Sequence, residues 1–167
     1  KALQALGEKR WQEKVALLSK GAELHDPKLR EAAQLVERGE LAAAEAIVRQ
    51  AVQDNPDDVA ALRILAAIGE RLERFEDAEA LLIRALKLAP HFAAAGFDLA
   101  NLFYRQNKLE AAIHQLDHLL ARHPDNAEYQ LPKAAPLSRL GKVDEALAIY
   151  ESVLSALSDE GPIWTLY

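Results

Sequence analysis

Two histidines and a glutamate have a spacing that could bind a metal ion. His114 and His118 are four residues apart, and Glu110 precedes His114 by the same interval, so a helix would place all three on one face. A catalytic zinc site also needs a dry cavity and an open coordination position, which a solvated helix face does not supply. We therefore favour three solvated side chains over a metal site, and we expect no cofactor.

Residues for other kinds of catalysis are present only singly. The chain has no cysteine, and its seven glycines are isolated, so no glycine-rich loop could hold a nucleotide or a phosphosulfate. None of the five serines, nor Thr165, occurs with His and Asp in a recognisable triad pattern. Adjacent carboxylates such as Glu76 and Asp77 lie where helices are expected to begin, which suits capping better than acid–base chemistry. We expect no catalytic centre in this chain.

The composition favours an all-helical domain. Half of the 167 residues are hydrophobic, Leu and Ala dominate, and aromatic residues, Gly and Pro are few. The net charge of −6 comes from acidic and basic residues mixed along the chain, so neither a basic stripe for nucleic acid nor a bilayer-spanning apolar run is present. The lack of cysteine is compatible with a reducing compartment, and we expect a cytoplasmic protein. Because Tyr167 falls inside an expected helix, we expect both ends to be points within a longer protein.

Three prolines reveal an internal repeat of 34 residues. They occur at a constant interval, in the pairs Asn55-Pro56, Ala89-Pro90 and His123-Pro124. A period of this length is typical of stacked helical hairpins. With proline at position 32, the repeats span 25–58, 59–92, 93–126 and 127–160, and a fifth begins at 161–167. Residues 1–24 are expected to form a capping helix or a degenerate repeat.

Alanine recurs at two positions of every repeat. Position 8 holds Ala32, Ala66, Ala100 and Ala134, and position 20 holds Ala44, Ala78, Ala112 and Ala146. Two antiparallel helices that cross at these positions could approach closely, because only methyl groups lie between them. Larger residues expected in the core recur at position 17, as Leu41, Phe75, Leu109 and Val143, and at position 24, as Val48, Leu82, Leu116 and Tyr150.

Turn and capping residues divide each repeat into two helices. The turns fall at Gly39, Glu73, Asn107 and Gly141, and Gly and Asn readily adopt the left-handed conformation. Asp26 before Pro27, and Asp125-Asn126 after Pro124, are suitable N-caps. We expect helices over 27–38, 42–54, 58–71, 76–88, 92–105, 110–122, 126–139 and 144–156. A ninth begins within 161–167, where Trp164 falls on position 4.

Residues 25–167 resemble the tetratricopeptide repeat superfamily at the alanine, large apolar and proline positions given above. The resemblance implies an all-α, right-handed superhelix of antiparallel helix hairpins, in which the first helix of each repeat lines a concave groove. It also implies a scaffold that binds a protein or peptide in this groove. The groove candidates carried over from the family positions are Arg63, Glu70, Arg71, Phe97, Asp98, Asn101, Tyr104, Arg105, Ser138 and Arg139.

These candidates suit an extended segment with acidic and apolar character, because arginines lie among aromatic residues. Asn101 and Tyr104 could contact a ligand or only bridge neighbouring helices, and both alternatives stay open. Some family members clamp the terminal carboxylate of heat-shock chaperones. We do not expect that clamp, since Asp98, Glu128 and Pro132 stand where it has Asn, Lys or Arg. Exposed solenoid ends could also cause self-association.

A narrower resemblance concerns residues 102–129, 133–154 and 163–167. Their sequences, LFYRQNKLEAAIHQLDHLLARHPDNAEY, KAAPLSRLGKVDEALAIYESVL and IWTLY, are similar to the amino-terminal repeat region of bacterial sulfotransferases that carry tetratricopeptide repeats. This resemblance implies a parent enzyme that uses a phosphosulfate donor and whose catalytic domain lies beyond Tyr167. A scaffold alone and the repeat region of such an enzyme are both open alternatives.

Two prolines fall inside the expected helix 126–139. Proline has no backbone N–H, so Pro136 cannot donate to the carbonyl of Pro132, and we expect a kink between Leu131 and Pro136. The kink could shape ligand access to the groove. Alternatively, helix packing compensates for a loss of roughly 3 kcal/mol, and this second interpretation is the one we favour.

Overall fold

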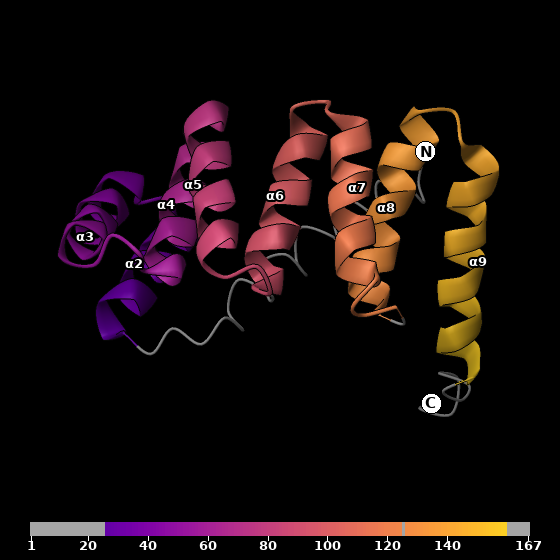
Figure 1. Ribbon diagram of the computed structural model, residues 1–167, viewed down its shortest axis with the longest axis horizontal. Helices are drawn as coiled ribbons and strands as arrows, with labels where there is room; N and C mark the ends of the chain where they lie inside the picture. Colours follow the sequence, from indigo (N-terminus) through magenta and orange to yellow (C-terminus); the bar gives the residue numbers. More distant parts are fainter. Residues whose placement is uncertain (1–25, 125, 160–167) are drawn as a thin grey trace. The chain divides into compact units, whose positions relative to one another are not determined.

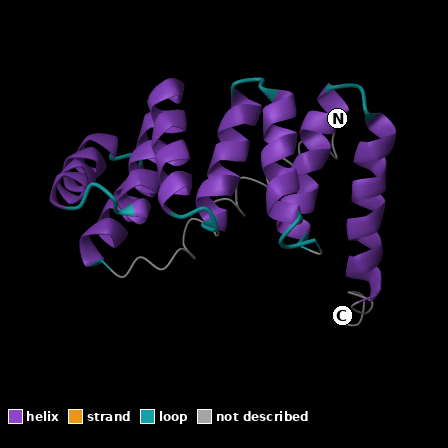
Figure 2. Ribbon diagram, viewed as in Figure 1, coloured by secondary structure: helices purple, strands orange, loops and turns teal. Residues whose placement is uncertain are grey.

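The computed structural model describes residues 26–124 and 126–159, and within these ranges the chain is entirely helical apart from its turns (Figures 1 and 2). The helices are α2 (Pro27–Arg38), α3 (Leu41–Asp54), α4 (Val59–Arg71), α5 (Phe75–Leu88), α6 (Ala93–Arg105), α7 (Leu109–Leu120), α8 (Ala127–Arg139) and α9 (Val143–Asp159). All eight helices predicted within these ranges are confirmed. The capping helix predicted within 1–24 and the ninth helix of 161–167 lie outside the described residues.

The first helices of three repeats begin at a side-chain cap. The Asp26 carboxylate accepts from the Lys28 amide at 2.8 Å, with Pro27 at the first helical position. The Asn126 side chain accepts from the Glu128 amide at 2.8 Å, and the Asp58 side chain accepts from the Ala61 amide, three residues along, at 2.9 Å. The predicted caps at Asp26 and Asn126 are therefore confirmed. Satisfying these amides defines where each first helix starts.

The turn inside each hairpin has one conformation in all four repeats. The backbone φ angle is positive at the four predicted turn residues: 80° at Gly39, 57° at Glu73, 61° at Asn107 and 78° at Gly141. The residue after each turn donates to a carbonyl five residues before it, in the bonds Glu40 to Leu35, Arg74 to Gly69, Lys108 to Phe103 and Lys142 to Leu137. Glu73 adopts this conformation although it is neither Gly nor Asn.

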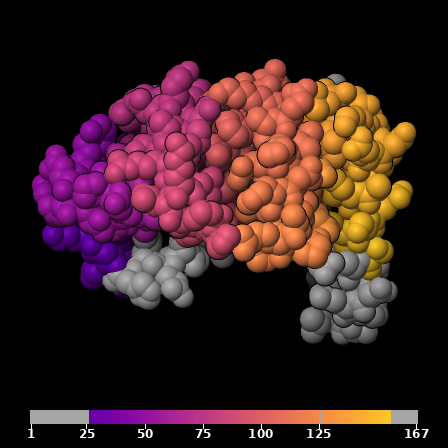
Figure 3. All heavy atoms as spheres, viewed as in Figure 1, coloured from indigo at the N-terminus to yellow at the C-terminus, as the bar shows by residue number. Residues whose placement is uncertain are grey.

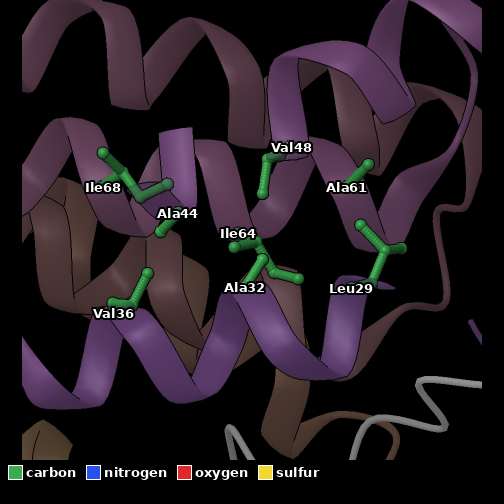
Figure 4. Close-up of a cluster of buried hydrophobic side chains, with 8 residues drawn as sticks. All are labelled: Leu29, Ala32, Val36, Ala44, Val48, Ala61, Ile64 and Ile68. Atoms are coloured by element: carbon green, nitrogen blue, oxygen red, sulfur yellow. The ribbon is translucent and has the colours of Figure 1, made fainter. Parts of the chain in front are cut away.

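The chain consists of two compact units, residues 1–102 and 103–167, and the boundary lies within α6. In the first unit α2 packs against α3, α3 against α4, and α4 against α5. The core shown in Figure 4 gathers side chains from α2, α3 and α4, namely Leu29, Ala32, Val36, Ala44, Val48, Ala61, Ile64 and Ile68. In the second unit α8 packs against both α7 and α9. A small cluster of Ala134, Leu137 and Ala146 is buried there.

The recurring alanines are buried in every repeat. All eight are at most 2% exposed, which confirms the predicted crossings: Ala32, Ala44, Ala66, Ala78, Ala100, Ala112, Ala134 and Ala146. At the crossing of α4 and α5, a methyl group added to Gly69 would lie 3.5 Å from the Cβ atom of Ala78 and 3.5 Å from the Arg74 carbonyl oxygen. The helices are therefore close enough that a side chain larger than alanine would push them apart.

The core prediction for positions 17 and 24 fails in the last repeat. Val48, Leu82 and Leu116 at position 24 are at most 3% exposed, whereas Tyr150 is 38% exposed. At position 17, Leu109 is buried at 7% exposure, Leu41 and Phe75 are half-buried, and Val143 is 52% exposed. The physical reason is the packing of the second helices: α4 covers α3 and α8 covers α7, but no helix of the described chain covers the corresponding face of α9.

Helix α8 continues through both of its prolines. Pro136 is fully buried, and Pro132 is half-buried. The Leu140 amide donates to the carbonyls of Pro136 and Leu137, which closes the last turn. The kink predicted between Leu131 and Pro136 stays a prediction.

Candidate functional site

Two of the predicted groove residues form an ion pair within the first unit. Arg63 in α4 and Asp98 in α6 are 35 residues apart in sequence, and Arg63 Nε donates to Asp98 Oδ2 at 2.5 Å. The side chains are only 9% and 19% exposed. The Arg63 guanidinium also lies 5.9 Å from the centre of the Phe92 ring, within the range of a cation–π contact.

The environment of this pair opposes ionisation of the carboxyl group. Burial raises the pKa of Asp98, and the attraction and hydrogen bond of Arg63 act in the opposite direction. A buried charge pair of this kind is stable only while both partners are present. In this structure Arg63 is bound by Asp98, so its guanidinium is part of the protein interior.

The prediction that Arg63 and Phe97 line an open groove needs correction. Arg63 is buried at 7% exposure and Phe97 at 2%, so neither presents a surface to a ligand. Large side chains at their repeat positions can be buried by neighbouring helices, which periodicity alone does not reveal. Among the other first-unit candidates, Glu70 and Asn101 are half-buried and Arg71 is exposed at the end of α4.

In the second unit, a tyrosine, an asparagine and an arginine come together. The Arg139 guanidinium lies over the Tyr104 ring, 5.2 Å from its centre. Arg139 Nη2 also donates to Asn107 Oδ1 at 2.8 Å. Tyr104 belongs to the last turn of α6, Asn107 to the following turn, and Arg139 to the last turn of α8. We call Tyr104, Asn107 and Arg139 the arginine platform.

The arginine platform holds a cation at the surface. Arg139 is exposed, and the described residues place no carboxylate against it. In contrast, Lys133 on the same helix pairs with Asp117 at 2.6 Å. The Tyr104 face and the Asn107 oxygen hold the Arg139 guanidinium in place, so the platform could accept an anionic group on its remaining N–H donors.

Some residues in and around the arginine platform were predicted to line the groove, and others were not. Ser138 is half-buried and Arg105 is exposed, each beside a platform residue in sequence. Tyr150 of α9 interacts electrostatically with Tyr104. The pKa of Tyr150 is raised, mainly by burial and in smaller part by Tyr104. Asn107 was predicted only as a turn residue. Its signal was available, because Asn107 and Arg139 are 32 residues apart, close to one repeat.

The histidines that suggested a metal site lie on the surface. His114, His118 and Glu110 are all exposed on α7. Among residues 26–124 and 126–159, no group of three or more His, Asp or Glu side chains is arranged to hold a metal ion.

Comparison with known families and curated proteins agrees with the geometry. Two family models described as tetratricopeptide repeat match residues 29–95 and 69–135, and together they cover most of the described chain. A TPR repeat-containing protein of Pseudomonas aeruginosa is 33% identical over 90 residues, which is 53% of this chain. The chain spans only 15% of the length of that relative.

Solved structures similar to this chain share its fold. MamA superimposes with a TM-score of 0.65 at 20% identity, covering 74% of this chain and 72% of its own. A tetratricopeptide repeat protein of Parabacteroides merdae gives a TM-score of 0.69 at 19% identity, covering 81% and 54% of the two chains. YrrB, described as a TPR protein with an unusual peptide-binding site, gives 0.64 at 19%, covering 77% and 66%. In the described part of this chain, no helix combines the length and apolarity needed to cross a membrane.

Proposed function

Because this chain is built of tetratricopeptide repeats, we propose that it is a scaffold that binds a protein partner through an extended segment, and that the arginine platform is the centre of the contact surface. The segment contributes a carboxylate to Arg139 and an apolar side chain beside Tyr104. The scaffold itself performs no chemistry. Its specificity comes from the few side chains that meet the segment.

The observation that carries this proposal is the state of Arg139. Its guanidinium is exposed, stacked on Tyr104 and bonded to Asn107, with no acidic partner among the described residues. Binding a carboxylate normally requires ordering a long arginine side chain, which costs about 0.5–1.5 kcal/mol. Here the ordering is already accomplished before the ligand arrives. An acidic group therefore gains a charge-assisted and potentially bidentate contact at a reduced entropic penalty.

Arg63 has a different role in this proposal. It was expected to contact the ligand together with Arg139, but its charge is already neutralised by Asp98. The proposed ligand surface therefore uses one arginine of the second unit, and the Arg63–Asp98 pair supports the first unit from inside.

A peptide library tests the proposal. The chain is immobilised, peptides are selected from a random library, and the dissociation constant of the best peptide is measured by titration. We expect selected peptides to share an acidic residue next to an apolar one. Arg139→Glu should weaken binding by at least about tenfold, since a charge-assisted hydrogen bond contributes roughly 1.5–3 kcal/mol.

Two variants serve as controls. Arg84→Glu makes the same charge change at an exposed arginine of α5, a second helix of a hairpin, and should leave the affinity unchanged. Arg139→Lys keeps the charge but loses the planar group and should give an intermediate affinity. Equal losses from Arg84→Glu and Arg139→Glu would show that only net charge matters, and an unchanged affinity of Arg139→Glu would place the contact elsewhere.

The resemblance of residues 102–129, 133–154 and 163–167 to repeat regions of sulfotransferases supports a second proposal. In it, the scaffold belongs to a parent enzyme and presents a protein substrate to a catalytic domain outside this chain. The test is an assay of the parent protein for transfer of sulfate from a phosphosulfate donor to peptides selected by the arginine platform. If the parent transfers no sulfate, only the first proposal remains.

A further inference from the structure

The turn residue Asn107 contributes two different polar groups to the arginine platform. Its Oδ1 atom accepts from Arg139 Nη2 at 2.8 Å. Because a guanidinium has donors only, the atom that meets it must be the amide oxygen, and this contact fixes the orientation of the amide. Asn107 is exposed, and the described residues place no acceptor against its Nδ2 atom. The platform therefore offers the amide donors of Asn107 beside the guanidinium donors of Arg139.

Both side chains belong to one edge of the second unit. Asn107 lies in the turn between α6 and α7, and Arg139 lies in the last turn of α8, just before the turn to α9. The two turns follow the upper edge in Figure 1, and the space-filling view shows atoms of this edge, coloured coral to orange, at the surface (Figure 3). An extended segment of a partner can therefore reach both residues.

The backbone limits which residue types can replace Asn107. Its φ angle is 61°, in the left-handed region that glycine, asparagine and aspartate adopt at the least cost. Glycine has no side chain that could hold Arg139. Aspartate would place a carboxylate against the guanidinium and cancel its charge. Of these three residue types, asparagine alone combines the turn conformation with a neutral acceptor and a donor.

The other repeats show that the turn itself does not require asparagine. The same turn position holds Gly39, Glu73 and Gly141, and φ is positive at each of them. Arg71 has the same repeat position as Arg139, and the turn residue one repeat before it is Gly39, which has no side chain to bind a guanidinium. The amide at position 107 is therefore explained by its contact with Arg139 better than by the turn.

From these observations we infer that Asn107 determines the charge preference of the arginine platform. This inference rests on the proposed function of the platform. Asn107 orients Arg139 without neutralising it, and its Nδ2 group donates to the same ligand carboxylate. A carboxylate in place of the amide would remove this donor, pair with Arg139 and repel the ligand. One turn residue thus decides whether the platform selects an acidic segment.

Two short peptides that differ by one charge test the inference. Acetyl-Glu-Leu-amide and its neutral counterpart acetyl-Gln-Leu-amide are titrated into the full chain while the backbone amide resonance of Tyr104 is followed. We expect the wild type to bind the acidic peptide about tenfold more tightly than the neutral one. Asn107→Asp should bring this ratio close to one. Asn107→Gly should still prefer the acidic peptide but bind it about two- to tenfold more weakly, because Arg139 is no longer held.

Gly39→Asp is the matched control for the added carboxylate. It makes the change at the equivalent turn position of the first unit, where an added Cβ atom meets nothing within 4 Å, and it should leave the ratio unchanged. A measurement without ligand accompanies the titrations. The heteronuclear NOE of Arg139 Nε should be high in the wild type and in Asn107→Asp, and low in Asn107→Gly. Far-UV circular dichroism checks that each variant retains its helices.

The possible failures can be told apart. The inference is overturned, and the proposed function is not, if Asn107→Asp keeps the ratio of the wild type or if Asn107→Gly leaves the NOE of Arg139 unchanged. The proposed function fails, and the inference with it, if the wild type binds both peptides equally or if Arg139→Glu binds the acidic peptide as tightly as the wild type does.

Discussion

At the residue scale, Glu73 stands out because its backbone is left-handed with a full side chain. A residue with a Cβ atom loses roughly 1–2 kcal/mol of stability in a left-handed conformation such as this one, where φ is 57°. Glycine avoids this strain, but it loses more backbone entropy on folding, so a substitution by glycine recovers only part of the difference. We expect Glu73→Gly to raise the free energy of unfolding by about 0.5–1 kcal/mol, measured by urea denaturation.

Asn107 provides the matched comparison for Glu73. Its φ angle is 61°, but asparagine tolerates this conformation, so Asn107→Gly should stabilise less than Glu73→Gly does. A Glu73→Gly variant no more stable than the wild type would mean that the Glu73 side chain contributes contacts that offset the backbone strain.

The Arg63–Asp98 pair gives a second prediction at this scale. Arg63→Leu should lower the free energy of unfolding by roughly 3 kcal/mol, because it leaves a buried carboxylate without its cation. The double variant Arg63→Leu/Asp98→Asn should lose less than the single one, since no charge is then buried. A double-mutant cycle in urea measures this coupling, and additive losses would contradict a direct interaction.

The same pair predicts a dependence of stability on pH. Burial raises the pKa of Asp98 above its ordinary value of 3.8, so the folded chain holds this proton more tightly than the unfolded chain does. Stability from this group is therefore present at low pH and is lost as pH rises through the folded pKa. In Arg63→Leu the effect should grow, and lowering the pH should recover part of the lost stability. Adding Asp98→Asn should abolish that recovery.

At the element scale, Pro132 shows how a proline inside a helix affects the stability of that helix. Pro132 is half-buried in the interior of the helix and denies the Glu128 carbonyl its donor. We expect Pro132→Ala to raise the free energy of unfolding by about 1–3 kcal/mol, measured by urea denaturation. Pro124→Ala, in the turn before α8, should bring no such gain. A destabilised Pro132→Ala variant would mean that the proline ring contributes more through packing than its missing N–H costs.

The alanine crossings give the second prediction for the elements. Ala134 of α8 is fully buried in one cluster with Ala146 of α9. Ala134→Leu should destabilise the chain by about 1–3 kcal/mol, because the extra carbons force these helices apart. Ala46→Leu, at an exposed position of α3, is the control and should change the unfolding midpoint little. Equal effects would argue against close packing at the repeated alanine.

The helices were predictable from the sequence because their signals are local and repeated. Asp26 and Pro27 indicate where the first helix of one hairpin begins, and Gly39 indicates where it ends. The 34-residue period then predicts the corresponding boundaries in the other repeats. Burial between repeats was not predictable in the same way. Phe97 and Arg63 were placed on an open surface, yet neighbouring helices cover both. The partner of Arg63 lies 35 residues away, close to one repeat, so the period indicates which side chains can be neighbours but not which of them form a pair.

At the scale of the whole molecule, the repeat explains both what is covered and what is exposed. The second helices α3 and α7 are covered by the next first helices, α4 and α8, and α9 lacks such a cover among the described helices. The polar surface of the first helices has no such requirement. Side chains such as Tyr104, Asn107 and Arg139 can therefore serve a partner without weakening the core.

The direct test of this assignment is an exchange of charges between Arg139 and its ligand. The dissociation constant is measured for wild type and Arg139→Glu, each with the selected acidic peptide and with a copy in which the acidic residue is lysine. Direct contact predicts that the wild type prefers the acidic peptide and that Arg139→Glu prefers the lysine peptide. If Arg139→Glu keeps the preference for the acidic peptide, Arg139 does not meet the ligand carboxylate and the platform is not the binding site.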